Sequence, residues 1–430
     1  MAVSTLAGTR EKGHRDGEGT VAQFDWPFGI AVDGEGNVFV ADAGNCRIRK
    51  ITPQGLVSTL AGTGEKGHQD GEGTVARFNT PCGVAVDGDG NVIVGDTRNH
   101  RIRKITPQGH VSTLAGTGEM GHEDGEGTVA RFNMPCGVSV DGDGNVIVAD
   151  RDNHRIRKIT PLGLVSTLAG NGEEGHQDGE GTVAQFDFPR GIAVDGEGNV
   201  IVGDTSNDRI RKITPQGHVS TLAGTGEEGH QDGEGTVAQF DHPCGVAVDG
   251  DGNVIVADAT NNRIRKITPQ GHVSSLAGAG EEGHEDGELV ASARFNMPCG
   301  VAVDEKGNAI VADTSNSCIR CVASDAVTPL VIVSLPPLPQ SSLLSDIQHH
   351  LFESGSFHDV CFVVEQERVP AHRSYLSARC EYFRSMFGAG FQEGDSAEIH
   401  INGTSCATFK ALLKYLYTDN MRWMTRCSLI

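Results

Sequence analysis

The chain has 430 residues, 37% of them hydrophobic, and a formal net charge of −22 at pH 7. This length accommodates two or three domains with buried cores, which excludes a largely disordered chain. The negative charge repels phosphate groups and argues against nucleic acid and anionic membranes as partners.

The chain also lacks the sequence features expected of a secreted or membrane protein. It opens MAVSTLAG, without a basic segment before an apolar run. The apolar stretch Leu330–Leu335 is far shorter than the roughly 20 residues that span a bilayer. The eleven cysteines are an odd number and cannot all pair, so reduced thiols are expected. We therefore predict a cytoplasmic or nuclear protein.

The motif VSTLAG, or its variant VSSLAG, recurs at intervals of 54 residues from Val3 to Val273. Such regularity indicates one supersecondary unit that is copied six times. Each copy contains four strand candidates, for example GVAVD, NVIVGD, RIRKIT and HVSTLAG, which are separated by Gly-rich and Pro-Gly turns. Four strands per unit are typical of a propeller blade, so residues 1–325 are predicted to form a mainly β, six-bladed propeller.

The sixth unit ends after its third strand, and two segments could supply its outer strand. Val3–Ala7 has the sequence of an outer strand, and Pro329–Ser334 follows the last repeat. Either segment would cover an edge that is otherwise unpaired. Both alternatives stay open at this point.

The repeat segment FNTPCGVAVDGDGNVIVGDTRNHRIRKITPQG resembles the NHL repeat, with its inner strand, its GNVxVAD strand and its Asn-His-Arg-like turn. The resemblance covers about residues 1–325. The turn keeps its Asn in all six units but its His only as His100 and His154. The resemblance implies a propeller that binds protein or RNA, and some relatives are enzymes.

Two loop motifs have the appearance of metal sites. The six histidines of the G-H-x-D-G-E motif are expected around one face, but equivalent loops on separate blades are too far apart to share an ion. The turn Asp87–Asn91 has alternate oxygen donors but lacks the distant bidentate Glu of a calcium loop. We interpret the first motif as loop-stabilising and the second as a hairpin turn.

The residue after the Pro that opens each inner strand is predicted to lie at one mouth of the central channel. The six residues at this position are Phe28, Cys82, Cys136, Arg190, Cys244 and Cys299. Four thiols on one ring could bind a soft metal, but structural zinc usually comes with closely spaced cysteine pairs. We prefer small thiols that pack at the entrance, and we expect no metal and no cofactor.

The RIRK strands carry ten arginines, which would form a basic band. Because Asp96, Asp150 and the loop acids lie close in sequence, paired and solvated surface charge is a better interpretation than RNA binding. Lactonases and amidating lyases share the six-bladed architecture, but nearly identical units disfavour a single tuned catalytic site. A channel enzyme and an RNA-binding propeller therefore stay as alternatives to a non-catalytic binding protein.

After Ala326 the repeat stops. Residues 326–342 contain VTPLVIVSLPPLPQSS, which is interpreted as an outer strand and a stiff, Pro-rich linker. From residue 343, the pattern predicts a helix, the strand DVCFVV, two short helices, the strand EIHI and a helix with Phe409, Leu412, Leu413 and Leu416 on one face.

Residues 343–419 resemble a BTB/POZ domain, a small α+β fold, through the segments HDVCFVV, VPAHRSYLSARCEYFRSMF and FKALLKYLYTD. The family implies dimerisation and, in many members, docking of a cullin scaffold. The positions that match its cullin-contacting, DV and AHR elements are Phe391, Gln392, Glu393, Asp359, His372 and Arg373. For Asp359 and His372 we prefer maintenance of the fold over direct partner contact.

The family continues past YLYTD with further helices, whereas this chain ends eleven residues later. We therefore expect the domain at 343–430 to be C-terminally incomplete and the apolar side of the Phe409–Leu416 helix to be exposed. The whole chain is interpreted as an adaptor. Its propeller would hold a client protein, and its BTB part would self-associate or recruit a cullin-based ubiquitin ligase.

Overall fold

The computed structural model describes residues 2–287, 292–324, 359–373, 376–377, 380, 383, 387, 398–401 and 404–418. The chain divides into two compact units, Met1–Ala326 and Val327–Ile430. Pro329–Ser334, the linker, the first predicted BTB helix and Phe391–Glu393 lie outside the described residues.

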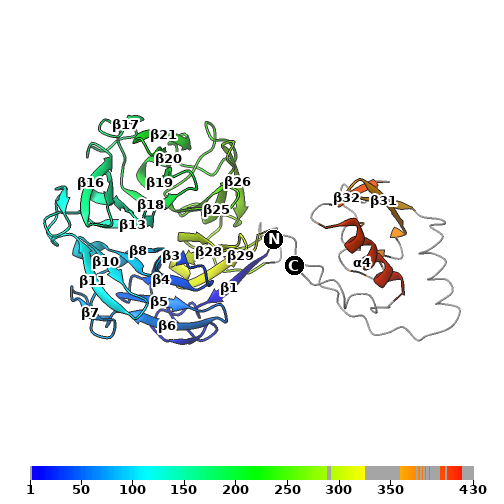
Figure 1. Cartoon of the computed structure of the whole chain (residues 1–430), viewed down its shortest axis with the longest axis horizontal. Helices are drawn as coiled ribbons and strands as arrows, with labels where there is room; N and C mark the ends of the chain where they lie inside the picture. Colours follow the sequence, from blue (N-terminus) through cyan, green and yellow to red (C-terminus); the bar gives the residue numbers. More distant parts are fainter. Residues whose placement is uncertain are drawn as a thin grey trace. The chain divides into compact units, whose positions relative to one another are not determined.

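The described part of the first unit forms six antiparallel sheets, the blades of a propeller (Figure 1). The inner strands are β3 (Pro27–Val32), β8 (Pro81–Val86), β13 (Pro135–Val140), β18 (Pro189–Val194), β23 (Pro243–Val248) and β27 (Pro298–Val303). The second strands are β4 (Val38–Asp42), β9 (Val92–Asp96), β14 (Val146–Asp150), β19 (Val200–Asp204), β24 (Val254–Asp258) and β28 (Ala309–Asp313). The third strands are β5 (Arg47–Ile51), β10 (Arg101–Ile105), β15 (Arg155–Ile159), β20 (Arg209–Ile213), β25 (Arg263–Ile267) and β29 (Cys318–Val322). The outer strands are β6 (Leu56–Ala61), β11 (His110–Ala115), β16 (Leu164–Ala169), β21 (His218–Ala223), β26 (His272–Ala277) and β1 (Val3–Ala7).

The N-terminal strand closes the ring. In the sixth blade the strand order is β1-β29-β28-β27, and β1 pairs antiparallel with β29 so that Val3 lies opposite Val322. Each inner strand contacts the next one along the chain, and β27 contacts β3. The six-bladed prediction is confirmed, and of its two closing strands the structure uses Val3–Ala7.

A two-residue strand that the sequence pattern did not indicate lies outside the outer strand in five of the described blades. These short strands are β2 (Gly17–Glu18), β7 (Gly71–Glu72), β12 (Gly125–Glu126), β17 (Gly179–Glu180) and β22 (Gly233–Glu234). Each belongs to the G-H-x-D-G-E segment, and each covers part of the edge that an outer strand would leave unpaired.

The hydrophobic core lies between neighbouring blades. Every residue of β9, VIVGD, is buried, because both faces of a blade pack against other blades. Near the axis the inner strands touch backbone to backbone. A Cβ atom on Gly83 would lie 2.1 Å from the carbonyl oxygen of Cys136 in the next blade. Only glycine allows the strands to approach this closely.

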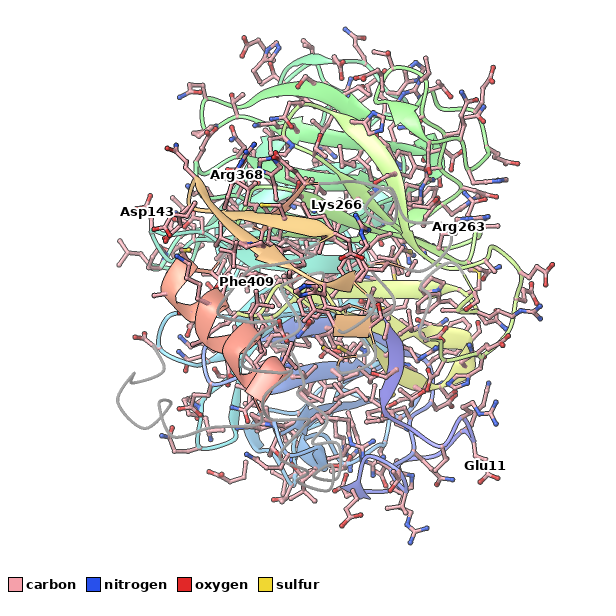
Figure 2. All side chains as sticks on the ribbon, turned by 90° about the vertical axis from the view of Figure 1, so that its right-hand side faces the viewer. Glu11, Asp143, Arg263, Lys266, Arg368 and Phe409 are labelled. Carbon is pink, nitrogen blue, oxygen red and sulfur yellow. The ribbon has the colours of Figure 1, made fainter. Side chains whose placement is uncertain are left out.

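Short 3₁₀ turns, η1 (Thr97–Asn99), η2 (Arg151–Asn153), η3 (Thr205–Asn207) and η4 (Thr314–Asn316), follow four of the second strands. Because Pro81 pairs with Asp96, these turns lie at the end of the blade where the inner strand begins. The Asp87–Asn91 turn lies at the opposite end. Acidic side chains such as Glu11 and Asp143 project from the propeller surface (Figure 2).

The second unit contains a hairpin of β30 (Val360–Val364) and β31 (Glu367–Ala371), a parallel strand β32 (Glu398–Ile401) beside β30, and α4 (Cys406–Thr418). Phe409 projects from α4 (Figure 2). Its ring meets that of Phe362 on β30 at a ring-centroid distance of 5.1 Å. Phe409, Leu412, Leu413 and Leu416 are 1–8% exposed. The prediction that this apolar side would be uncovered is therefore wrong, because it packs into the core around Phe362.

None of the helices in the described part of the chain combines the length and the apolar character needed to cross a bilayer.

Candidate functional site

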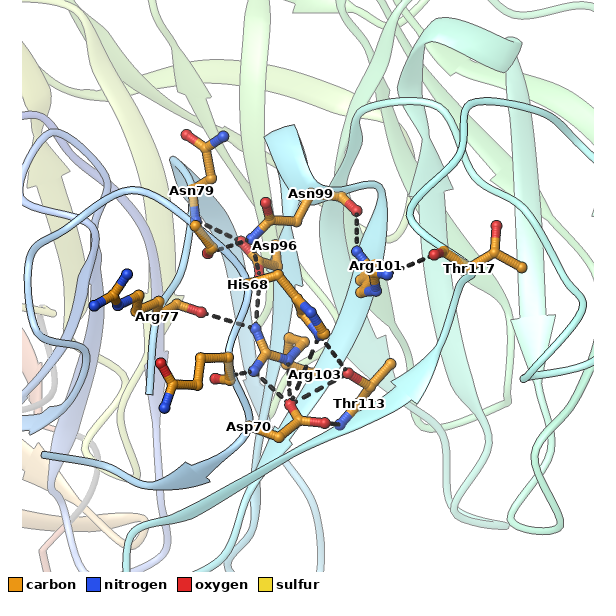
Figure 3. Close-up of polar contacts among 12 residues, drawn as sticks. His68, Asp70, Arg77, Asn79, Asp96, Asn99, Arg101, Arg103, Thr113 and Thr117 are labelled. Carbon is orange, nitrogen blue, oxygen red and sulfur yellow. Dashed lines mark hydrogen bonds and ion pairs between the residues drawn. The ribbon is translucent and has the colours of Figure 1, made fainter. Parts of the chain in front are cut away.

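The repeated charged residues lie inside the blades, as the second blade shows (Figure 3). Arg103 of β10 is fully buried, and its guanidinium donates to Asp96 Oδ2 at 2.8 Å and to Asp70 Oδ1 at 2.6 Å. It also donates to the carbonyl oxygens of Arg77 and Gln69. The outer loop that carries Asp70 is thereby tied to the centre of its blade.

The same network occurs in every blade. In each, one arginine bonds two aspartates at 2.6–2.9 Å and lies 5.0–5.2 Å from the centre of a phenylalanine ring. The six arginines are Arg49, Arg103, Arg157, Arg211, Arg265 and Arg320. All six are fully buried. Five of them belong to the ten RIRK arginines, so the prediction of solvated surface charge is wrong for half of that set. Nucleic acid cannot reach these side chains.

The remaining repeated polar residues also form hydrogen bonds within their own blade. Burial raises the pKa of Asp96, while the Asn79 N–H, the Asn99 amide and Arg103 act to lower it. His68 Nε2 lies 2.9 Å from Thr113 Oγ1, which agrees with a loop-stabilising role. Asp87 Oδ1 accepts the N–H groups of Asp89 and Asn91, as expected for a turn that holds itself.

The mouth of the channel has a different character. The six residues predicted to meet there line one cavity of about 60 Å³ together with the glycines and aliphatic residues that follow them. These residues are Phe28, Cys82, Cys136, Arg190, Cys244 and Cys299. The structure thus brings this predicted set together at the point where the inner strands converge.

A second ring of variable residues precedes the prolines. It consists of Trp26, Thr80, Met134, Phe188, His242 and Met297, and all have left-handed backbone with φ between 45° and 53°. Side chains with a Cβ atom seldom adopt this conformation, and such strain is concentrated at functional sites. Trp26 is 52% exposed and Met297 38% exposed.

Charged residues gather on blades three and four. The Arg151 guanidinium lies 5.9 Å from the centre of the Phe188 ring, and the His154 ring meets the same phenylalanine edge-on at 4.9 Å. His154 Nδ1 lies 3.4 Å from Asp187 Oδ1, and His154 Nε2 lies 3.8 Å from Glu174 Oε1. Burial raises the pKa of Asp187. His154, Glu174 and Asp187 form one of two groups in the described part of the chain whose donor atoms lie within 4.8 Å of one another, and Asp208, Asp241 and His242 form the other.

One blade further on, the members of the second group also bond one another. His242 Nδ1 lies 2.9 Å from Asp241 Oδ1, and the His242 N–H donates to Asp208 Oδ1 at 2.7 Å. The hydrogen bond to Asp241 raises the pKa of His242, although burial lowers it. We assign no metal to this set.

The prediction from nearly identical units did not include the differences between blades at the mouth. The sequence nevertheless indicates these differences. When the six units are compared position by position, Arg103 and Asp96 have equivalents in every blade, whereas Arg151 is replaced by Ala43 in the first blade and Thr97 in the second. The columns that surround the mouth are among those that vary.

In the second unit, the predicted partner residues contact each other. The Arg373 N–H donates to Asp359 Oδ1 at 2.8 Å, the Arg373 guanidinium lies 5.1 Å from the centre of the Phe387 ring, and His372 is buried. These contacts position the start of β30 and the residues after β31. Phe391, Gln392 and Glu393 are outside the described residues.

Two family models match the chain. The NHL repeat matches residues 24–51, 78–105, 132–159, 186–213, 240–267 and 295–322. The BTB/POZ domain matches residues 349–426.

Known proteins resemble separate parts of the chain. Protein SUPPRESSOR OF QUENCHING 1, chloroplastic, from Arabidopsis thaliana is 30% identical over 80% of this chain and 35% of its own length. Human BTB/POZ domain-containing protein 9 is 44% identical over 18% of this chain and 13% of its own length. The chain thus spans only a minor part of each relative.

A solved structure from Bacteroides thetaiotaomicron, described as a structural genomics protein of unknown function, superposes with a TM-score of 0.60. The alignment covers 75% of each chain at 22% identity, which supports the propeller fold alone.

Proposed function

We propose, from the premise that this chain is an NHL-repeat propeller protein with a C-terminal BTB/POZ domain, that it is a non-catalytic adaptor in the cytoplasm or nucleus. The propeller would hold a client protein at the channel mouth. The BTB/POZ domain would self-associate or recruit a cullin scaffold, so that the client becomes a target of protein ubiquitination.

The single observation that carries this proposal is the concentration of blade-specific residues at one face. Trp26, Met297 and Arg151 belong to residue types that are enriched in protein interfaces. They lie at the end of the blades where Pro81 pairs with Asp96, whereas the Asp87–Asn91 turn at the other end recurs with little change. A client would therefore contact the mouth rather than the turns.

Site-specific photo-cross-linking tests the client proposal. A photo-reactive phenylalanine analogue replaces Trp26 at the mouth or Asp89 on the opposite turns, in the full chain expressed in cells. We expect a defined protein adduct from position 26 and none from position 89. Adducts from position 89 alone, or the same adducts from both positions, would remove the mouth as the client site.

The cullin proposal requires a separate binding experiment. Purified full-length protein is titrated with the N-terminal domain of a cullin, and light scattering measures its own oligomeric state. Phe391→Ala combined with Glu393→Ala should weaken cullin binding at least tenfold, whereas Arg368→Ala on β31 should not. A folded protein that binds no cullin and stays monomeric would contradict both proposed roles of the BTB/POZ domain.

A further inference from the structure

Arg190 is a charged side chain without an acidic partner. It lines the mouth cavity, and its Nε–H is buried with no hydrogen-bond acceptor. Within the described residues its guanidinium has one hydrogen-bond partner, the Cys244 sulfur at 3.6 Å from Nη1. The interior arginines are different, because Arg103 and its equivalents each bond two aspartates.

The charge of Arg190 needs compensation. A guanidinium stays protonated in proteins, and a partly buried charge without a counter-charge is unfavourable. No carboxylate in the described part of the chain pairs with Arg190, and the group hydrogen-bonded to it that can become an anion is the Cys244 thiol.

The sulfurs of the same ring differ in their hydrogen-bond partners. The Cys82 and Cys299 thiols lie within donating distance of backbone carbonyl oxygens, those of Thr80 at 3.6 Å and Met297 at 3.4 Å. The Cys299 thiol can alternatively donate to Cys244. Cys244 instead accepts an N–H group from Arg190.

Three groups act on Cys244 from the elements around it. They are Cys299 on β27, Arg190 on β18 and His242 at the start of its own strand. The hydrogen bond with Cys299 and the charge of Arg190 lower the pKa of Cys244 to about 6, although burial raises it. The hydrogen bond with Cys244 and burial raise the pKa of Cys299. These contacts favour the thiolate form of Cys244 and the thiol form of Cys299.

We propose that Cys244 is a thiolate paired with Arg190 and that it is a site of oxidation by hydrogen peroxide, with Cys299 as the thiol that completes a disulfide. The cavity of about 60 Å³ admits an oxidant of this size. The strands that carry the two cysteines also approach closely, because a Cβ atom on Gly245 would lie 2.4 Å from the Cys299 carbonyl oxygen, and Cys244 and Cys299 pack in one buried cluster.

The reaction has two balanced steps. The Cys244 sulfur attacks one peroxide oxygen, the O–O bond breaks, and hydroxide leaves and is protonated to water, which gives a sulfenic acid. Cys299 then loses its proton and attacks the oxidised sulfur, so that an S–S bond forms, the S–O bond breaks and a second water leaves. Two thiols are oxidised, and one peroxide is reduced to two waters.

Peptide mapping of the full chain tests the proposal. Trypsin releases Cys244 in residues 213–263 and Cys299 in residues 295–306, and neither peptide contains another cysteine. After brief exposure to dilute peroxide and alkylation of the remaining thiols, we expect these two peptides to be linked. In the reduced protein at pH 7, iodoacetamide should modify Cys244 about tenfold faster than Cys46, which is buried to a similar degree.

Variants at the mouth separate the charge of Arg190 from its packing. Arg190→Gln should slow both reactions at least tenfold, Arg190→Lys should largely retain them, and Arg101→Gln on β10 should leave them unchanged. Circular dichroism checks that each variant is folded. Equal alkylation of Cys244 and Cys46, unaltered oxidation of folded Arg190→Gln, or no link between the two peptides would overturn the proposal.

Discussion

At the interior position of Arg103 all six blades carry an arginine, whereas at the mouth position of Arg190 they carry one phenylalanine, one arginine and four cysteines. The interior residue has the same partners in every blade, so a substitution there would break a blade without changing what the surface presents. The mouth residue has few obligatory partners and is free to differ. The comparison indicates that repetition maintains the fold and that the proposed client site lies where the blades depart from repetition.

The largest effect is expected in the interior. Arg103→Met leaves Asp96 buried without its cation and should lower the free energy of unfolding by about 3–5 kcal/mol. Arg101→Met on the same strand, where the side chain is partly exposed and bonds only carbonyl oxygens, should cost about 1 kcal/mol. Urea unfolding followed by circular dichroism measures both. Equal costs would mean that the buried network does not stabilise the blade.

The close approach of the inner strands gives the next effect. In Gly83→Ala the new methyl group meets the Cys136 carbonyl oxygen, so a loss of about 1–3 kcal/mol is expected. Gly88→Ala is the matched control, because no atom lies within 4 Å of its Cβ position. Its change should stay within about 0.5 kcal/mol in the same urea titration.

The strained ring at the mouth should respond in the opposite direction. Thr80 has φ of 51°, so Thr80→Gly removes an unfavourable conformation and should stabilise the protein by about 1 kcal/mol. Thr80→Ala keeps a Cβ atom in the same backbone and should gain less. Differential scanning calorimetry compares the two. A lower melting temperature for Thr80→Gly would show that its side chain contributes more than its strain costs.

The smallest effect on stability is expected at the exposed mouth. Trp26→Ser should change the free energy of unfolding by less than about 1 kcal/mol, because half of the side chain is exposed. Binding of a client should nevertheless weaken at least tenfold, since exposed tryptophans at interfaces contribute strongly. Titration of the cross-linked client, once purified, against both proteins measures this difference.

Much of the fold could be predicted from the sequence, because the 54-residue period is long, regular and complete. The short strand Gly71–Glu72 could not be predicted, since two residues with a glycine carry no alternating pattern. The sequence also could not choose the closing strand, because pairing of Val3 with Val322 depends on contacts between the two ends of the repeat array.

The site was predicted only in part. The position of Cys82 and its equivalents at the mouth followed from symmetry, since each begins an inner strand. The burial of Arg103 did not follow, because its partner Asp70 lies 33 residues away and the RIRK strand resembles a solvated one. Burial alone would have predicted a raised pKa for the Cys244 thiol, whereas its hydrogen bond to Arg190 in the neighbouring blade acts in the opposite direction.

The division between a repeated interior and a blade-specific mouth is tested most directly by comparing two full-length double variants in quantitative affinity capture. Trp26→Ser with Arg151→Gln alters the mouth, and Asp89→Ala with Asp143→Ala alters the exposed turns at the other end. Both should unfold at nearly the same urea concentration as the wild type. The account predicts that only the mouth variant loses the proteins captured by the wild type, and loss from the turn variant with retention by the mouth variant would contradict it.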